Sequence, residues 1–309
     1  MRLLGLSLRL LTLLLILLFA TLLLVLNNEK LSRWAIIEGS SYVPGLSISD
    51  SAGTLWQGLQ LDGIRYTQDG LEINAPKAFI HVDSFSLWRG KLIVKQLKTE
   101  QLHIHITESA KPVEDADDNT PFTLPHLRTP LHIGLLDLSL EGSTLSFAEQ
   151  SYVLDRIQLA AYWRGNMLAI NHAKANAYES AVELTGNLYM QGDWPLNLNA
   201  KWHASIPEQI AAYLPDAHGQ GRIAVRGTVK ALTINQELEQ PIKLAGLVKL
   251  WLFEEPLRFD VQQAWTAFSL KFGDELINVE QGNVNLIGNL SRYKLQLETG
   301  LQYQAWPPL

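Results

Sequence analysis

Most of the chain alternates strictly between apolar and polar residues. The stretch LEINA (71–75) sets leucine, isoleucine and alanine against glutamate and asparagine. The same period of two recurs in LNLNAKWHA (196–204), FSLKF (268–272) and YKLQLE (293–298). Such alternation is typical of antiparallel strands with one apolar and one polar face. Because Gly, Asn and Asp interrupt the pattern as hairpin turns do, it predicts about fifteen strands.

Two segments show a helical spacing instead. In EKLSRWAIIEGSSY (29–42) the apolar residues recur as in one or two turns of amphipathic helix. We expect this helix to lie along a membrane face with Trp34 at headgroup level. The stretch IPEQIAAYLPD (206–216) predicts a second helix, with Pro207 well placed for its first turn.

The first 29 residues predict a membrane anchor. Leu10 to Leu26 are 17 consecutive uncharged, mostly aliphatic residues, and about 20 apolar helical residues span a bilayer core. A cleaved signal peptide is the alternative, but the apolar run is too long for one and LVLNNEK contains no small-x-small cleavage site. Arg2 and Arg9 place the N-terminus in the cytoplasm and the rest across the membrane, which in a bacterium is the periplasm.

The stretch LHIHI (102–106) raises the question of a metal site. His103 and His105 would point the same way from a strand, and neutral imidazole is a common metal ligand. No third ligand is tied to this pair by spacing, and His81 and His132 are only the nearest candidates. Asparagine and lysine hold the same positions in LNLNAKWHA. We therefore interpret the two histidines as a solvated strand face and predict no metal.

A tryptophan followed by one residue and a glycine occurs in LWQG (55–58), LWRG (87–90) and YWRG (162–165). Glycine permits the positive φ that hairpin turns prefer, and the tryptophan can cap the apolar interior at the bend. The predicted turn and packing residues are Trp56, Gly58, Trp88, Gly90, Trp163 and Gly165.

Residues 108–130 break the alternation with five acidic residues and four prolines. Composition of this kind does not pack, so we predict a solvated linker between two sheet segments. A calcium loop is the alternative, but DADDNT lacks the glycine and distal glutamate of an EF-hand.

Composition narrows the classes of function. The chain has 309 residues, a formal net charge of −6 and no cysteine, which excludes disulfides and thiolate metal sites and gives no electrostatic reason to expect nucleic acid. It contains no G-x-S-x-G, H-E-x-x-H or P-loop motif. We therefore predict neither an enzyme nor a cofactor.

Several stretches resemble the start of TamB, the translocation and assembly module subunit, in the AsmA-like superfamily. They are VPGL (Val43–Leu46), a glycine and tryptophan before an alternating strand (Gly53–Tyr66), and leucine–tryptophan before another strand (Leu87–Ile106). The acidic linker and GDWPLNLNAKW (Gly192–Trp202) are also similar. The resemblance is fairly specific over residues 1–110 and diffuse afterwards.

This resemblance implies a mostly β fold. A transmembrane helix in the bacterial inner membrane is followed by an elongated, curved antiparallel sheet, a taco-shaped, β-helix-like groove with an apolar concave face. It also implies movement of phospholipid between inner and outer membranes, and support of outer-membrane protein assembly with the barrel partner TamA. Family members are several times longer and end in a C-terminal domain that this sequence does not contain, so a truncated or fragmentary form is expected.

Physical reasoning from the residues leads to the same groove. A sheet of about fifteen strands with one apolar face and no covering helices must curl to hide that face, leaving a trough roughly 70 Å long that suits acyl chains. The predicted groove residues are Leu71, Ile73, Leu92, Val94, Leu102, Ile104, Ile106, Leu196, Leu198, Trp202, Phe268, Leu270, Leu295 and Leu297.

The predicted organisation has four parts: an anchor (1–29), an amphipathic helix with a first groove segment (30–107), the linker (108–130) and further groove repeats (131–309). A lipid conduit is the preferred interpretation. The alternatives are an assembly scaffold that binds a barrel partner by strand pairing, and a membrane-tethered hydrolase or metal enzyme.

Overall fold

The computed structural model describes residues 28–54, 56–107, 124–147, 150–214, 216–273 and 275–303. This part is mostly β-structure, as predicted, with twenty strands and three helices. The chain divides into two compact units, unit 1 (1–112 and 133–154) and unit 2 (113–132 and 155–309). The predicted anchor lies almost wholly outside the described residues, among which no helix is long and apolar enough to cross a membrane.

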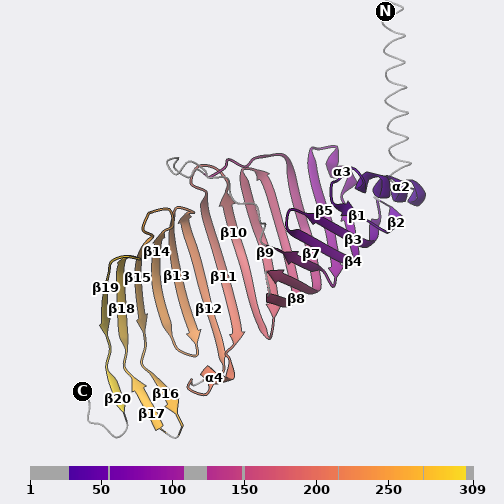
Figure 1. Ribbon diagram of the computed structural model, residues 1–309. Helices are drawn as coiled ribbons and strands as arrows, with labels where there is room; N and C mark the ends of the chain where they lie inside the picture. The colour runs from indigo at the N-terminus through magenta and orange to yellow at the C-terminus, as the bar shows by residue number, and fades with distance from the viewer. Residues whose placement is uncertain are drawn as a thin grey trace, which may run out of the picture. The chain divides into compact units, whose positions relative to one another are not determined.

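Unit 1 is built around strands β3 and β4 (Figure 1). β3 pairs antiparallel with β1, β2 and β4, and β4 pairs antiparallel with both β5 and β6. The elements are α2 (Glu29–Ser40), β1 (Leu46–Ser47), β2 (Asp50–Thr54), β3 (Gly58–Gln68), β4 (Leu71–Val82), α3 (Ser84–Leu87), β5 (Lys91–Glu100), β6 (His103–Ile106) and most of β7 (Thr129–Phe147).

One strand pair departs from the antiparallel prediction. β6 runs parallel to β7, with His103 facing Thr144 and Ile106 facing Phe147. Parallel neighbours need a connection of a dozen or more residues, because the chain must return to the end of the sheet at which it started. The acidic segment between β6 and β7 supplies that length, which gives the linker a topological role.

A line of irregular residues crosses four strands of unit 1. Gly63 in β3 lies opposite Pro76 in β4, Gln101 follows β5, and its amide donates to the carbonyl beside Gly142 in β7. Gly63, Gln101 and Gly142 have φ of 63°, 55° and 58°, and proline has no amide hydrogen to donate. Such irregularities re-aim side chains. Accordingly, the apolar positions shift between odd and even residue numbers at this line.

The interior of unit 1 contains small and medium-sized residues. Leu59, Ala75 and Ala78 are buried, and the Thr99 hydroxyl donates to the Lys77 carbonyl at 2.8 Å. The first predicted helix is confirmed as α2, in which the Asn28 side chain accepts the amide hydrogen of Leu31 as an N-cap.

Unit 2 is an antiparallel meander in which β8 to β15 pair in chain order, followed by β18 and β19 (Figure 1). Its strands are most of β8 (Gln150–Gly165), β9 (Met167–Ala177), β10 (Ser180–Tyr189), β11 (Pro195–Ser205), β12 (His218–Thr228), β13 (Ala231–Gln240), β14 (Leu244–Trp251), β15 (Arg258–Trp265), β16 (Phe268–Phe272), β17 (Glu275–Val279), β18 (Gly282–Asn289), β19 (Tyr293–Glu298) and β20 (Leu301–Tyr303).

A second, three-stranded sheet in unit 2 contains β16, β17 and β20. Because Trp265 at the end of β15 already faces Gly282 at the start of β18, the hairpin between them does not join the meander. Phe268 and Leu270 pair with β17 in this small sheet. They therefore lie outside the main row of groove residues in which the sequence placed them.

Two loops of unit 2 differ from the sequence prediction. The helix expected over 206–216 contains only the four residues of α4 (Glu208–Ala211), because the residue before Pro215 is disfavoured in a helix. The described end of the linker is exposed over residues 125–128, but two hydrogen bonds fix it to the rest of unit 2. The Trp194 indole donates to the Pro125 carbonyl at 2.9 Å, and the Leu127 amide donates to the Met190 carbonyl at 3.1 Å.

Candidate functional site: an apolar face across the strands of unit 2

The strand registers of unit 2 align apolar residues into rows that cross the sheet. Leu198 faces Val225, which faces Ile234, and the same register continues from strand to strand. We call the complete set the central row. It contains Ala161, Ile170, Gly186, Leu198, Val225, Ile234, Val248, Val261, Leu286 and Leu295. With neighbouring strands about 4.8 Å apart, this row extends roughly 43 Å without a polar side chain.

Parallel rows on the same face contain Leu196, Trp202 and Leu297, of which the exposed Leu297 faces Val284, whereas Phe268 and Leu270 lie in the small sheet. Leu196 faces Leu188 on one side and Gly227 on the other. Trp202 faces Val182 and Gly221, and its indole lies against Gly219 and Gly221, where a β-carbon would contact the ring. Large side chains thus lie beside glycines, which keeps this face close to level between neighbouring strands.

One row is interrupted by polar side chains. Gly246 faces Gln236 on one strand and Gln263 on the next. The Gln263 side chain lies over Gly246, since a β-carbon at Gly246 would be 2.6 Å from its amide carbon. The Gln263 side-chain oxygen is buried and accepts no hydrogen bond within the described residues. This position is the most polar point on an otherwise apolar face.

The central row is neither buried nor fully exposed. Nine of its ten members are half-buried, and Leu295 in β19 is 57% exposed. A sealed core would bury most of these side chains, as protein interiors are closely packed. The sheet therefore presents a continuous apolar face that is open to a ligand of matching chemistry.

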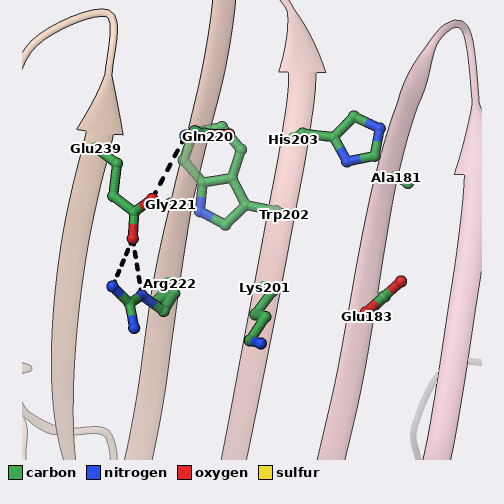
Figure 2. A pocket seen from close by; sticks show the side chains of 9 residues that line it. All are labelled: Ala181, Glu183, Lys201, Trp202, His203, Gln220, Gly221, Arg222 and Glu239. Atoms are coloured by element: carbon green, nitrogen blue, oxygen red, sulfur yellow. Dashed lines mark hydrogen bonds and ion pairs between the residues drawn. The ribbon is translucent and has the colours of Figure 1, made fainter.

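The opposite face is charged, and several of its charges form ion pairs. A cavity of about 340 Å³ is lined by Glu183, Lys201, Arg222 and Glu239 and also by Trp202 and Gly221 (Figure 2). Arg222 contacts Glu239 at 2.6 Å. The ammonium of Lys174 donates to Glu183 at 2.9 Å, and this hydrogen bond lowers the pKa of the glutamate. A lowered pKa keeps the Glu183 carboxylate ionised rather than poised for acid–base chemistry.

Predicted groove residues of unit 1 also meet across strands. Ile73 faces Ile104, and Leu71 faces Ile106. Ile104 in turn faces Leu145 of β7, and the shorter Val94 faces Val82. Leu92 and Leu102, the remaining predicted groove residues of this unit, are half-buried.

The histidines of β6 alternate with these apolar residues. His103 faces Asn74, and His105 faces Glu72. Among the residues that the structure describes, no group of three or more potential ligands could hold a metal ion. The arrangement agrees with the interpretation of His103 and His105 as part of a polar strand face.

The glycines of the repeated tryptophan motif have positive φ, but two of the tryptophans do not pack as predicted. Gly58 at the start of β3, Gly90 in the turn before β5 and Gly165 at the end of β8 have φ of 119°, 67° and 59°. Trp56 and Trp88 are more than half exposed, so their predicted role as interior caps is wrong. They lie beyond the last paired residues of their hairpins. Trp163, which faces Leu168, is half-buried.

The family model for the N-terminal domain of TamB matches the chain over residues 15–179 and again over 122–309. The chain belongs to the TamB N-terminal domain family. Membership confirms the resemblance seen in the sequence and supports a TamB-type role in translocation and assembly. All residues that the structure describes lie within the matched stretches. No solved structure matches the chain.

Proposed function

We propose that the chain carries phospholipid along the apolar face of unit 2. In this proposal it is a single-pass protein of the bacterial inner membrane, with a cytoplasmic N-terminus and its bulk in the periplasm. The sheet curves around its apolar face, and lipid moves along that face towards the outer membrane. The protein thereby supports outer-membrane protein assembly. The observation that carries the proposal is the central row, which crosses ten strands without a polar side chain.

Acyl chains match this surface in chemistry. Each methylene removed from water contributes about 0.8 kcal/mol, so an acyl chain and the half-exposed row gain from covering each other. The paired charges of the opposite face favour water instead, which restricts lipid to one side of the sheet. Because the sequence contains no catalytic motif and Glu183 and Glu239 of this face have cationic partners, we propose no enzymatic activity and no cofactor.

A charge in the central row tests the proposal. We expect Ile234→Asp to reduce the phospholipid that copurifies with the chain several-fold, because acyl chains would have to pass a hydrated carboxylate. Thr233→Asp is the matched control, since Thr233 is the preceding residue on the opposite face and pairs with Lys249. Lipid phosphate per chain is measured together with the urea midpoint of each variant. Equal lipid content in both folded variants would refute the conduit.

The alternative function is a scaffold that binds a barrel partner, TamA by family resemblance, without lipid transport. One observation favours it: β19 is exposed along its whole length and, among the described residues, pairs only with β18. An exposed strand edge can pair with a strand of another chain. Since the chain has no cysteine, a single Lys294→Cys can be tested for disulfide cross-linking to cysteines along the barrel's edge strands. Cross-links in one register, combined with no loss of assembly in Ile234→Asp, would favour the scaffold.

A further inference from the structure

Two helices of unit 1 turn small polar residues inward and large apolar residues outward. In α2, Ser32 is fully buried whereas Trp34 is 65% exposed. In α3, Ser84 is buried whereas Phe85 is 59% exposed, and Trp88 directly after the helix is exposed to the same extent. Soluble helices normally bury their apolar face. The reversed orientation indicates that the outward side chains meet something other than water.

These exposed side chains lie at one end of unit 1. The Gly53 amide donates to the Glu29 carboxylate at 3.2 Å, which places the start of α2 beside the end of β2. Leu59 faces Ile80, so the turn before β3 and the connection after β4 share that end. Trp56, in the turn before β3, is 52% exposed.

The connection after β4 is held by its own hydrogen bonds. The Ser86 hydroxyl donates to the Asp83 carboxylate at 2.6 Å, and the Arg89 amide donates to the Ser86 carbonyl at 3.0 Å. The Arg89 guanidinium lies 5.0 Å from the centroid of the Phe85 ring. The backbone thus fixes which side chains point outward, including Leu87, which is also exposed.

We propose that Trp56, Phe85, Leu87 and Trp88 form a membrane-docking surface that enters the headgroup layer of a phospholipid bilayer. We call these four residues the tip surface. Aromatic side chains favour the membrane–water interface, and apolar side chains of interfacial segments enter it by about 5–10 Å.

Two features of the chain favour a bilayer as the occupant. Asn28, the N-cap of α2, follows the apolar run Leu10–Leu26 by two residues. A bilayer that holds this run would therefore lie next to the tip surface. Arg89 and Lys91 flank the tip surface and match the negative charge of phosphate and of anionic headgroups. The inference goes beyond the proposed conduit and does not depend on lipid passing along unit 2.

Single-cysteine labelling of the full chain tests the tip surface. Phe85→Cys and Leu87→Cys receive a nitroxide label, and the chain is reconstituted into liposomes of phosphatidylethanolamine and phosphatidylglycerol. Collision of the nitroxide with oxygen, which concentrates in lipid, is compared with collision with a water-soluble nickel chelate. We expect the oxygen-to-nickel ratio at both sites to exceed severalfold the ratio at Glu72→Cys. Glu72 is the exposed control near the opposite end of β4, roughly 30 Å away.

The outcomes separate a lipid surface from other occupants. Equal nickel accessibility at Phe85, Leu87 and Glu72 in liposomes that float with the chain would overturn the proposal. Failure of the chain to float with the liposomes would overturn it as well. Shielding of the tip sites that appears only after another protein is added would assign the surface to a protein partner, contrary to the proposal. An unchanged urea midpoint verifies that each labelled variant folds, which we expect because the substituted side chains are exposed.

Discussion

Units 1 and 2 share an alternating sequence pattern but differ in the polar side chains that they bury. Buried hydroxyl residues such as Ser51, Thr99 and Ser143 lie in unit 1, whereas each unit buries a few hydrophobic side chains, Leu59, Ala75 and Ala78 in unit 1 and Ala181, Met190 and Val279 in unit 2. In unit 2 every member of the central row keeps part of its surface accessible. Alternation therefore determines which side chains share a face, whereas coverage depends on what folds over that face. The predicted groove residues of unit 1 are half-buried as well, so the two units differ in the side chains beneath their apolar rows more than in how far those rows are covered.

The largest expected difference between the units comes from placing the same charge in both. Leu59→Asp puts a carboxylate where a side chain is 4% exposed, and we expect a loss of several kcal/mol that unfolds unit 1. Leu198→Asp leaves the carboxylate within reach of water, so we expect a loss of about 1 kcal/mol. Urea unfolding followed by circular dichroism measures both. Similar losses would contradict the contrast between the units.

Substitution of a glycine beside Trp202 tests how tightly the side chains of the apolar face pack. A methyl group at Gly221 would overlap the Glu237 carbonyl and contact the Trp202 indole, so Gly221→Ala should cost about 1–3 kcal/mol. Gly165→Ala is the comparison, because its methyl group meets nothing within 4 Å and only its φ of 59° is unfavourable. We expect a cost of about 1 kcal/mol there. A shift of tryptophan fluorescence should accompany the first change only.

Gln263 allows the polar interruption of the apolar face to be removed. Gln263→Leu replaces a buried, unsatisfied amide oxygen, and we expect a gain of about 1 kcal/mol together with more bound lipid. The neighbouring Gln262→Leu lies on the opposite, exposed face and should change neither quantity. Lipid phosphate per chain and urea midpoints measure the two effects. A lower lipid content in Gln263→Leu would show that the amide assists lipid rather than interrupting its path.

The smallest expected effects are electrostatic and occur in both units. The Ser86 hydroxyl holds the pKa of Asp83 in unit 1 below its ordinary value of 3.8, and the Lys174 ammonium holds the pKa of Glu183 in unit 2 below 4.5. A carboxyl group with a lowered pKa stabilises the fold above its unfolded pKa, and this contribution disappears as the pH falls through the folded value. Both contributions should therefore be constant at neutral pH and decrease as the pH falls below the unfolded values of 3.8 for Asp83 and 4.5 for Glu183.

Variants of the donors identify the cause of these pKa shifts. Ser86→Ala should return the pKa of Asp83 towards 3.8, and Lys174→Gln should return that of Glu183 towards 4.5. Carboxyl chemical shifts followed by NMR titration measure each value. An unchanged pKa in either variant would show that the hydrogen bond is not its cause. Because both carboxylates reach solvent, we expect little change in the unfolding midpoint.

Where the strands pair in regular register, the sequence predicted both the strands and the face on which each side chain lies. Leu196, Leu198 and Trp202 share a face of β11 as their alternation required. It could not predict the parallel pair of β6 and β7, because the period of two is identical for parallel and antiparallel neighbours. The odd-to-even shift at Gln101 was also missed, since nothing in its residue type requires the observed φ of 55°.

Other parts of the site depend on tertiary structure. Phe268 and Leu270 alternate as regular strand residues do, but the early pairing of β15 with β18 separates them from the main sheet. The helix α3 has only four residues, too few for a helical period to be recognised. In this region the sequence offered only the motif LWRG. The motif predicted the turn at Gly90 correctly, but it did not predict that Trp88 points outward.

Photo-crosslinking tests the central claim, that acyl chains occupy the open face of unit 2, most directly. A photoreactive residue is placed at Val248 in the central row, at its neighbour Lys249 on the opposite face, and at the buried Leu59 of unit 1. After irradiation in intact cells, phospholipid adducts are identified by mass spectrometry. The account predicts adducts at Val248 and none at Lys249 or Leu59. Adducts at none of the three positions, or equal adducts at Val248 and Lys249, would contradict it.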